Sequence, residues 1–412
     1  MYRLWKRGRL FNYHFLERLT IYRAEQEHRL EKAHDFWIHA VSVGEVLIAR
    51  ALLRELRTLS PHVRVVITTT TPTGHQVALP LQDERTLVLF APFDFPFIQR
   101  RAFMKIRPRK LLLIESEIWP NMIWQASAFN VPIALINARL SDRTAQRYQK
   151  FSFFIRPLLD HLEIIFAQDP SDIPRLRAAG FPSDRIVCPG SMKYDVAALT
   201  WSAPSTAPKQ ILNKLKWPEQ APILLVASTH PGEEAMIAEL WPTLHKNFPQ
   251  LKCVIAPRHA ERGSSILQLF RNLDLHRAIL RSQLSPESTP PSIDILILDT
   301  TGELRSWFPF ATVVIVGKSF RAHGGQNFIE AAQAGKPIIV GPNMENFLPQ
   351  TQAFVNQKAL IQLENENQLL PTLLELLSSP QKAQDIAQRA QKLFQESCGA
   401  AKRTALHLLN QK

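Results

Sequence analysis

The hydrophobic positions of the chain form short apolar runs, separated by longer stretches in which they recur at helical spacing. In the first half these runs are rich in Val, Ile and Leu, as are strands that are buried on both faces of a sheet. The predicted strands are Asp35–Val43, Val63–Thr70, Thr86–Phe90, Lys110–Ile114, Val131–Ile136 and Ile164–Ala167. A helix is predicted over Glu45–Leu59, and most other intervals have a helical pattern. This alternation predicts an α/β fold with a parallel sheet covered on both faces.

The periodicity fails from Ala197 to Gln220, where Ala203-Pro204-Ser205 and Ala207-Pro208 indicate a linker, and then the alternation restarts. The second set of predicted strands is Ile223–Ala227, Leu251–Ala256, Ile293–Leu298, Thr312–Val316 and Pro337–Val340. Residues 379–411 have a helical pattern. We therefore predict two doubly wound, Rossmann-like domains, residues 1–203 and 204–395, and a helix over 396–412 that packs back toward the first domain. Two such domains would face a cleft at the carboxyl ends of their strands.

Composition adds a strong positive charge to this picture. The 412 residues have a formal net charge of +13 and a sequence pI near 9.8. Such a surface attracts polyanions, which include nucleic acid, an anionic bilayer and a phosphorylated substrate. One cluster combines Arg3, Lys6, Arg7 and Arg9 with the apolar residues Leu4, Trp5, Leu10 and Phe11, and another spans residues 100–110. Each cluster fits a membrane surface and fits a solvated helix face equally well.

Cysteine content and hydropathy limit the cellular setting. The three cysteines, at positions 188, 253 and 398, have no disulfide or zinc-ligand spacing, which is typical of a reducing cytoplasm. No apolar run reaches the length of a membrane span, and the first residues lack the apolar core of a signal peptide. Any membrane contact is therefore expected to come from the side.

Acidic residues follow two of the predicted strands in the first domain. Glu45 stands where the strand beginning at Asp35 gives way to a helix, which places its carboxylate at the carboxyl edge of the sheet. A functional acid and a simple helix-dipole partner are equally good interpretations of this position. Glu115 and Glu117 follow the fourth strand two residues apart, so in an extended segment they would project from the same side. Close carboxylates raise each other's pKa, which favours a functional role over two exposed acids.

Lys193 follows a short strand and a Pro-Gly turn near the end of the first domain. A lysine so near the linker is well placed to face a cleft. From the residues alone, however, an ordinary surface lysine is the favoured interpretation.

The second domain has polar motifs after three of its strands. They are Pro257-Arg258-His259, the segment Asp299–Leu304, and a glycine-rich loop from Gly317 that leads into a predicted helix with Asn327 and Glu330 in its first turn. Backbone N–H groups at such a helix start can cradle a phosphate, and an acid there can accept from ribose hydroxyls. The loop fits neither the P-loop nor the G-x-G-x-x-G pattern. It indicates a nucleotide or a sugar phosphate without choosing between them.

These segments, in this order, resemble the family of 3-deoxy-D-manno-octulosonic acid (Kdo) transferases. The resemblance covers nearly the whole chain and is specific as a set. Its motifs are Thr71–Gly74, Glu115–Asn121, Asn137–Ser141, Gly190–Lys193, Ser228–Glu234, Pro257–His259, Gly302-Glu303 and His323–Asn327. It implies a GT-B fold, the donor CMP-Kdo, and as acceptor the tetra-acylated disaccharide phosphate precursor of lipid A.

The resemblance also implies roles for individual residues. Glu45 would be the general base, Glu115 and Lys193 would stabilise the transition state, and the second domain would bind CMP. The implied CMP contacts are Pro257, Arg258, Thr301, Gly302, Glu303, Asn327, Phe328, Ile329 and Glu330. A single base that activates an acceptor hydroxyl on the face opposite CMP inverts the anomeric centre without a covalent intermediate. Such a reaction needs no cofactor or metal, and nothing in the sequence resembles a metal site.

Two departures from the family pattern bear on these expectations. Members commonly carry an apolar N-terminal anchor, whereas this chain begins with a short, strongly basic segment. We therefore expect peripheral attachment to the cytoplasmic face of a bacterial inner membrane. Position 301 is Thr, and Asn327 is followed by Phe rather than the more usual Pro, which affects little if those contacts are made by the backbone.

Three alternatives remain open on the sequence. Another GT-B glycosyltransferase with a UDP-sugar donor, or an epimerase of the same fold, would share the architecture. A basic scaffold that binds RNA or a membrane would share the charge. The scaffold is disfavoured because no aromatic-basic RNA motif is present and the acids after the strands are retained, so we expect no nucleic-acid partner.

Overall fold

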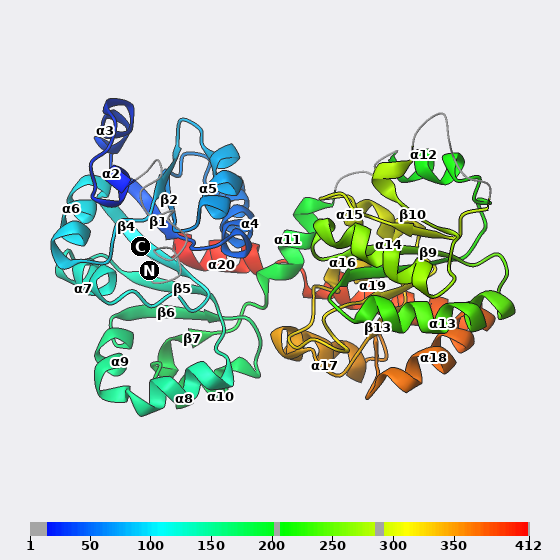
Figure 1. Cartoon of the computed structure of the whole chain (residues 1–412). Coiled ribbons are helices and arrows are strands. Elements are labelled where there is room, and N and C mark those ends of the chain that lie inside the picture. Colours follow the sequence, from blue (N-terminus) through cyan, green and yellow to red (C-terminus); the bar gives the residue numbers. More distant parts are fainter. Residues whose placement is uncertain (1–14, 202–206, 285–291, 411–412) are drawn as a thin grey trace. The chain divides into compact units, whose positions relative to one another are not determined.

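The computed structural model describes residues 15–201, 207–284 and 292–410. The basic cluster at residues 3–11 and the expected boundary between residues 203 and 204 lie outside them. The chain forms two compact units (Figure 1), an N-terminal unit of Met1–Leu199 with Ser397–Lys412 and a C-terminal unit of Thr200–Glu396. Each unit contains one sheet of seven strands, so the α/β prediction is confirmed.

The strands of the N-terminal unit pair in parallel, in the order β3-β2-β1-β4-β5-β6-β7. They are β1 His34–His39, β2 Val65–Thr69, β3 Thr86–Phe90, β4 Pro108–Ile114, β5 Ile133–Ala138, β6 Leu162–Ala167 and β7 Ile186–Val187. The helices are α2 Phe15–Arg18, α3 Ala24–Leu30, α4 Val43–Leu59, α5 Pro72–Ala78, α6 Pro96–Ile106, α7 Pro120–Ala128, α8 Asp142–Lys150, α9 Ser152–Leu159, α10 Asp172–Ala178, α11 Met192–Thr200 and α20 Ala400–Asn410.

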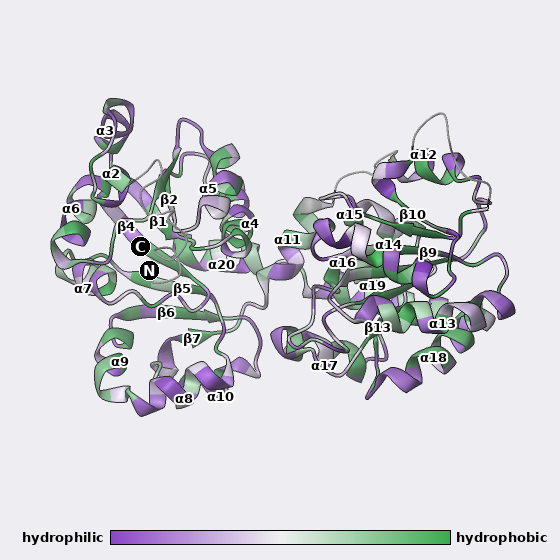
Figure 2. Ribbon diagram, in the orientation of Figure 1, coloured by the Kyte–Doolittle hydropathy of each residue, from purple (hydrophilic) through white to green (hydrophobic). Residues whose placement is uncertain are grey.

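Both faces of this sheet are buried, as the continuous apolar strands predict. Alternate residues of β1 enter different cores, Phe36 and Ile38 on one face and Trp37 on the other. The first face packs against α4 and α20, and the second against α6, α7 and α9. In Figure 2 the strands are correspondingly green, the colour of hydrophobic residues. The sheet is thereby a rigid platform from whose carboxyl edge the loops after β1, β4 and β5 extend.

The C-terminal unit repeats this architecture with the strand order β10-β11-β9-β8-β12-β13-β14, again paired in parallel. Its strands are β8 Ile223–Thr229, β9 Lys252–Pro257, β10 Ala278–Leu280, β11 Ile295–Ile297, β12 Val313–Val316, β13 Ile338–Val340 and β14 Ile361–Gln362. Its helices are α12 Ala207–Lys214, α13 Glu233–Asn247, α14 Gly263–Asn272, α15 Leu304–Trp307, α16 Ile329–Gln333, α17 Leu348–Asn356, α18 Leu369–Ser378 and α19 Pro380–Ser397. The central strand β8 lies between β9 and β12, which is where ligands bind in doubly wound sheets.

Two sequence expectations need correction. The aperiodic stretch 197–220 is not a plain linker, because it contains the end of α11 and the whole of α12. The helical pattern over 379–411 is two helices, α19 and α20, separated at Gly399, which has a φ of +92°. Glycine adopts this left-handed conformation without the penalty that a Cβ would impose, so the helix breaks there.

Candidate active site

Glu45 lies in the first turn of α4, six residues beyond His39, the last residue of β1. Its Oε2 accepts the backbone N–H of Val41 at 2.6 Å, and its Oε1 accepts the hydroxyl of Ser42 at 3.0 Å. Only 7% of the residue is exposed. Ser42 and Glu45 thus occupy the N-cap and N3 positions of α4, and the Glu45 carboxylate accepts from the turn that precedes the helix. This geometry fits both interpretations of the acid.

The environment of Glu45 favours its protonated form. Burial raises the pKa of Glu45 to about 7, the hydrogen bond from Val41 opposes the rise, and the carboxylates of Glu117 and Glu115 add to it. A carboxylate with a pKa near 7 can exchange a proton at neutral pH, as a general base must. Perturbed pKa values of this kind are common among acids that act in catalysis.

The segment Thr71–Gly74 supports the turn before Glu45. The Val41 carbonyl accepts the backbone N–H groups of Thr70 and Thr71 at 3.3 and 3.1 Å. Gly74 passes so close that an added Cβ would lie 2.8 Å from the Thr71 hydroxyl and 3.3 Å from the Ser42 carbonyl carbon. A glycine is therefore required at this position, and the turn that presents Glu45 is held from β2.

Glu115 and Glu117 follow β4, but not in the extended segment that the sequence suggested. Glu115 has a φ of +62° and begins a turn, with its N–H donated to the Ile136 carbonyl at 2.8 Å. Left-handed backbone at a non-glycine residue is costly and is often found at functional sites. Burial raises the pKa of Glu117, the indole N–H of Trp119 at 2.8 Å opposes this, and Glu115 adds to it. The three acids Glu45, Glu115 and Glu117 therefore interact electrostatically at one edge of the sheet.

Lys193, in the first turn of α11, joins this group. It is partly buried, which corrects the interpretation as an ordinary surface lysine. Burial lowers the pKa of Lys193 and the negative charge of Glu115 raises it, so the two side chains attract each other. A buried cation beside a carboxylate can stabilise charge that develops in a reaction.

A buried polar network fixes the start of α11. Asn137, near the end of β5, accepts the N–H of Met192 on its Oδ1 at 3.0 Å, and its carbonyl accepts the Gln168 side-chain amide at 2.8 Å. The Ser191 hydroxyl donates to Gln168 Oε1 at 3.3 Å. This network gives a structural purpose to the motif that begins at Asn137, because it sets the position of Lys193.

In the C-terminal unit, four of the predicted contacts line one pocket. Pro257 ends β9 and Arg258 follows it, and Thr301 and Gly302 follow β11. Ser228 and Thr300, which stand in motifs of the sequence but were not among the predicted contacts, line the same pocket. The Arg258 guanidinium is exposed, and no hydrogen bond or ion pair of it is found within the described ranges. It is thus available to an anion.

The predicted phosphate cradle after β12 differs from expectation. The helix α16 begins at Ile329 and has five residues, so Asn327 precedes it and accepts the Ile329 N–H at 3.1 Å. Phe328 and Ile329 are fully buried, which leaves only their backbone for a ligand. The N–H groups of Lys318, Ser319 and Phe320 are already donated to Glu233. The early part of the glycine-rich loop therefore cannot cradle a phosphate.

Glu303 and Glu330 lie near the pocket in ion pairs. Glu303 pairs with Arg281 at 3.2 Å, and Glu330 pairs with Arg305. Because Arg305 is on α15, the second pair ties the loop after β12 to the helix that follows the pocket loop. Both acids keep a free acceptor capacity, since a carboxylate has about four acceptor sites.

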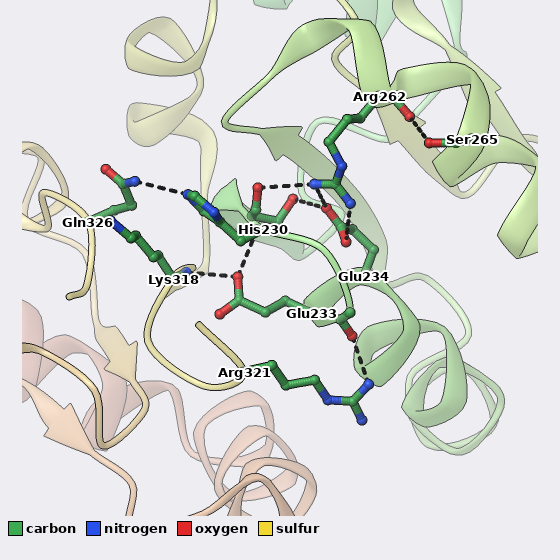
Figure 3. A network of polar contacts seen from close by, with 10 residues as sticks. His230, Glu233, Glu234, Arg262, Ser265, Lys318, Arg321 and Gln326 are labelled. Atoms are coloured by element: carbon green, nitrogen blue, oxygen red, sulfur yellow. Dashed lines mark hydrogen bonds and ion pairs between the residues drawn. The ribbon is translucent and has the colours of Figure 1, made fainter. Parts of the chain in front are cut away.

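Sequence reasoning missed Glu233 and Glu234 as organising residues, although they stand inside a recognised motif. Both are 1% exposed and hold partners far away in the sequence (Figure 3). Two adjacent acids in the first turn of a helix were the available signal. Within residues 15–201, 207–284 and 292–410, no group of three or more His, Cys, Asp or Glu side chains is arranged to hold a metal.

Comparison with known proteins identifies the class of the fold. A glycosyltransferase from Rickettsia africae is similar with a TM-score of 0.62 and 14% identity, over 92% of this chain and 100% of that one. A UDP-N-acetylglucosamine 2-epimerase is similar with the same TM-score and identity, over 92% of this chain and 96% of the epimerase chain. Two seven-stranded α/β units with these neighbours define the GT-B fold.

The sequence comparisons identify the family. The profile described as "3-Deoxy-D-manno-octulosonic-acid transferase (kdotransferase)" matches residues 13–196. The 3-deoxy-D-manno-octulosonic acid transferase of Bordetella pertussis is 32% identical over 89% of this chain and 85% of its own length. That of Haemophilus influenzae is 29% identical over 89% and 84%. The chain belongs to the Kdo transferase family and is a glycosyltransferase.

Proposed function

We propose that this enzyme transfers Kdo from CMP-Kdo to the lipid A precursor lipid IVA, with inversion at the anomeric carbon, in lipopolysaccharide core biosynthesis. Residues 1–203 would form the acceptor-binding domain and 204–395 the CMP-Kdo-binding domain, with residues 396–412 packing toward the former. The observation that carries the proposal is the buried carboxylate of Glu45 beside Glu115 and Glu117 at the carboxyl edge of the first sheet, in a chain that belongs to this family.

In the proposed reaction Glu45 is the general base. Its carboxylate takes the proton from a primary hydroxyl of the acceptor as that oxygen forms the bond to the anomeric carbon of Kdo. The bond from this carbon to the phosphate oxygen breaks, and CMP leaves with the electron pair. One displacement inverts the centre. Glu115 and Lys193 would stabilise the transition state, supported by their mutual attraction beside Glu45.

The C-terminal unit would hold the nucleotide. Arg258 is proposed to meet the phosphate, because its guanidinium is exposed beside the pocket and has no partner in the described part of the chain. Pro257, Thr301, Gly302 and Glu303 would contact CMP from the two loops that form the pocket. The loop from Asn327 to Glu330 would complete the site, through side chains at its two ends and through backbone at Phe328 and Ile329.

We further propose that the protein meets the cytoplasmic face of the inner membrane from its side. No helix among the described residues is both long and apolar enough to cross a bilayer. The exposed Phe and Trp side chains of the described residues all belong to the N-terminal unit, and Phe153 and Phe154 on α9 are 83% and 70% exposed. Arg143, Arg147 and Lys150 on the preceding α8 are exposed as well, and such a mixture suits an anionic lipid surface.

The proposal is tested by mass analysis of the product. The purified protein is incubated with CMP-Kdo and lipid IVA, and in parallel reactions UDP-sugars replace the donor. We expect the acceptor to gain the mass of one or more Kdo residues with CMP-Kdo alone. Transfer from a UDP-sugar, or epimerisation of one, would contradict the assigned donor, while Kdo transfer to a different acceptor would contradict only the assigned acceptor.

A further inference from the structure

The carboxylate of Glu233 holds together two loops that are far apart in the sequence. Glu233 is the first residue of α13, just after β8, and is 1% exposed. It accepts backbone N–H groups from His230 at 2.9 Å, Lys318 at 2.7 Å, Ser319 at 3.0 Å and Phe320 at 3.1 Å. Figure 3 shows it between His230 and Lys318. One side chain therefore satisfies the whole turn that follows β12.

This turn lies too close to β8 to keep its shape unaided. A Cβ on Gly317 would stand 2.6 Å from the Ser228 carbonyl oxygen and 2.7 Å from both Glu233 Oε2 and Thr229 Cα. The next residue, Lys318, has a φ of +57°, which costs conformational energy at a non-glycine position. Without this acceptor, the buried N–H groups of Ser319 and Phe320 and the part-buried N–H of Lys318 would also lose their partner. The carboxylate is thus the element that stabilises a strained turn.

Glu234 stabilises the loop on the opposite side of β8, the one that follows β9. Its Oε1 accepts the Thr229 hydroxyl at 2.6 Å, and its two oxygens accept the Arg262 guanidinium at 2.8 and 3.0 Å. Arg262 ends the loop after β9 that begins with Arg258, and the Arg258 N–H is donated to the Thr229 carbonyl at 3.0 Å. Since β8 lies between β9 and β12, two successive acids of one helix reach the loops on both sides.

We infer that Glu233 and Glu234 are positioning residues of the donor site, each fixing one of its walls. Glu234 sets the loop that carries Arg258, and Glu233 sets the loop that leads to Asn327. Neither carboxylate meets the donor itself, because each residue is only 1% exposed and its oxygens face protein donors. This inference rests on the proposed function, since it gives the two acids a purpose in binding CMP.

The test measures CMP affinity by calorimetry on the full-length chain. Glu233→Gln and Glu234→Gln preserve size but replace an acceptor oxygen with an amide that faces N–H donors. We expect each to weaken CMP binding about tenfold or more, as losing the support of a ligand-contacting residue typically does. Glu239→Gln is the matched control, because Glu239 is an exposed acid on the same helix. It should bind CMP as the parent does.

Double variants separate positioning from a general loss of structure. Glu233→Gln and Asn327→Ala should not act independently on CMP affinity. The double variant should bind CMP at least about threefold more tightly than the product of the two single losses predicts. The losses of CMP affinity caused by Glu233→Gln and by Arg258→Ala should multiply, because the two residues belong to different loops. Glu234→Gln should show the reverse pattern, overlapping Arg258→Ala alone. Mere destabilisation would give the same relation with both partners.

Each outcome decides something. Unchanged CMP affinity in both acid variants, or equal coupling to both partners, would overturn the inference while leaving the proposed function intact. A parent protein that neither binds CMP nor transfers Kdo would overturn the proposed function and this purpose together. If Glu233→Gln does not fold, as a thermal unfolding curve would reveal, the Glu234→Gln cycle with Arg258→Ala still tests the other half.

Discussion

The carboxyl edges of the two sheets use acidic residues in opposite ways. In the N-terminal unit the buried carboxylate of Glu45 accepts hydrogen bonds from the Val41 N–H and the Ser42 hydroxyl, and burial raises the pKa of Glu45 to about 7. In the C-terminal unit Glu233 is buried more deeply but accepts four backbone N–H groups. Burial therefore does not by itself make an acid reactive. A carboxylate filled by protein donors holds neighbouring loops in place, whereas one with few donors keeps room for a further partner.

The same contrast extends to the cations. Lys193 in the N-terminal unit is partly buried and interacts with Glu115, so at this edge a cation lies among carboxylates. At the other edge Arg262, Arg281 and Arg305 are paired, but Arg258 has no partner among the described residues. One edge is suited to a proton acceptor and the other to an anion, which is the division of labour that the proposed transfer requires.

The largest expected effect follows from removing the acid at the first edge. Glu45→Gln keeps the size of the side chain but cannot accept a proton, so turnover should fall by about 10²–10⁴. Binding of CMP should be unchanged, because the loss belongs to the transition state. Steady-state kinetics and calorimetry check this, with Glu55→Gln on the same helix as the control. If Glu45→Gln kept near-parental turnover, and its rate still fell at acidic pH as in the parent, another carboxylate would be the base. Glu115 is the next candidate.

The next effect concerns the cation of the second edge. Arg258→Ala should weaken CMP binding by about one to two powers of ten, since a charged hydrogen bond contributes about 1.5–3 kcal/mol. The fold should be unaffected, because the guanidinium is exposed. Calorimetry with CMP measures the change, and Arg271→Ala on the exposed face of α14 serves as the control. Equal affinity in the parent and in Arg258→Ala would mean that the nucleotide binds elsewhere.

A smaller effect tests the electrostatic coupling at the first edge. Glu45 must be ionised to act, so the rate should rise with pH through the pKa of about 7. The negative charge of Glu117 helps to keep Glu45 protonated, and Glu117→Gln should therefore move this acidic limb to lower pH. The amide oxygen can still accept the Trp119 indole N–H. If Glu117→Gln had the parental rate at high pH and the same apparent pKa in its pH–rate profile, Glu117 would not interact with the base.

The smallest effect concerns attachment to lipid. The exposed aromatic residues and the basic residues of the N-terminal unit should bind vesicles more strongly as the fraction of anionic lipid rises, and less strongly as salt rises. The double variant Phe153→Ser, Phe154→Ser should co-sediment with anionic vesicles less than the parent does. Leu348→Ser, at an exposed apolar position of the C-terminal unit, is the control. Binding that ignores lipid charge and salt would reject the surface mode.

The sequence predicted the long central strands of the sheets better than the short strands near the sheet edges. The run Thr86–Phe90 coincides with β3, because a strand buried on both faces is apolar at every position. The short strands Ala278–Leu280 and Ile361–Gln362 were not predicted, since two or three residues carry no period. Strand-end positions such as Glu45 were visible because parallel strands align their carboxyl ends. The contact of Glu233 with Lys318 was not, because it joins positions 85 residues apart.

The return of α20 to the N-terminal unit has a consequence for biosynthesis. Ala400, Ala401, Ala405 and Leu408 complete the core on the face that α4 covers, and Asp195 accepts the N–H groups of Gly399 and Ala401 at 2.6 and 3.0 Å. These residues leave the ribosome only after the whole of Thr200–Glu396 has been made. At typical elongation rates that delay is roughly ten to forty seconds. Throughout it the first domain has an uncovered apolar face, so a nascent chain stalled before residue 397 should aggregate or recruit a chaperone.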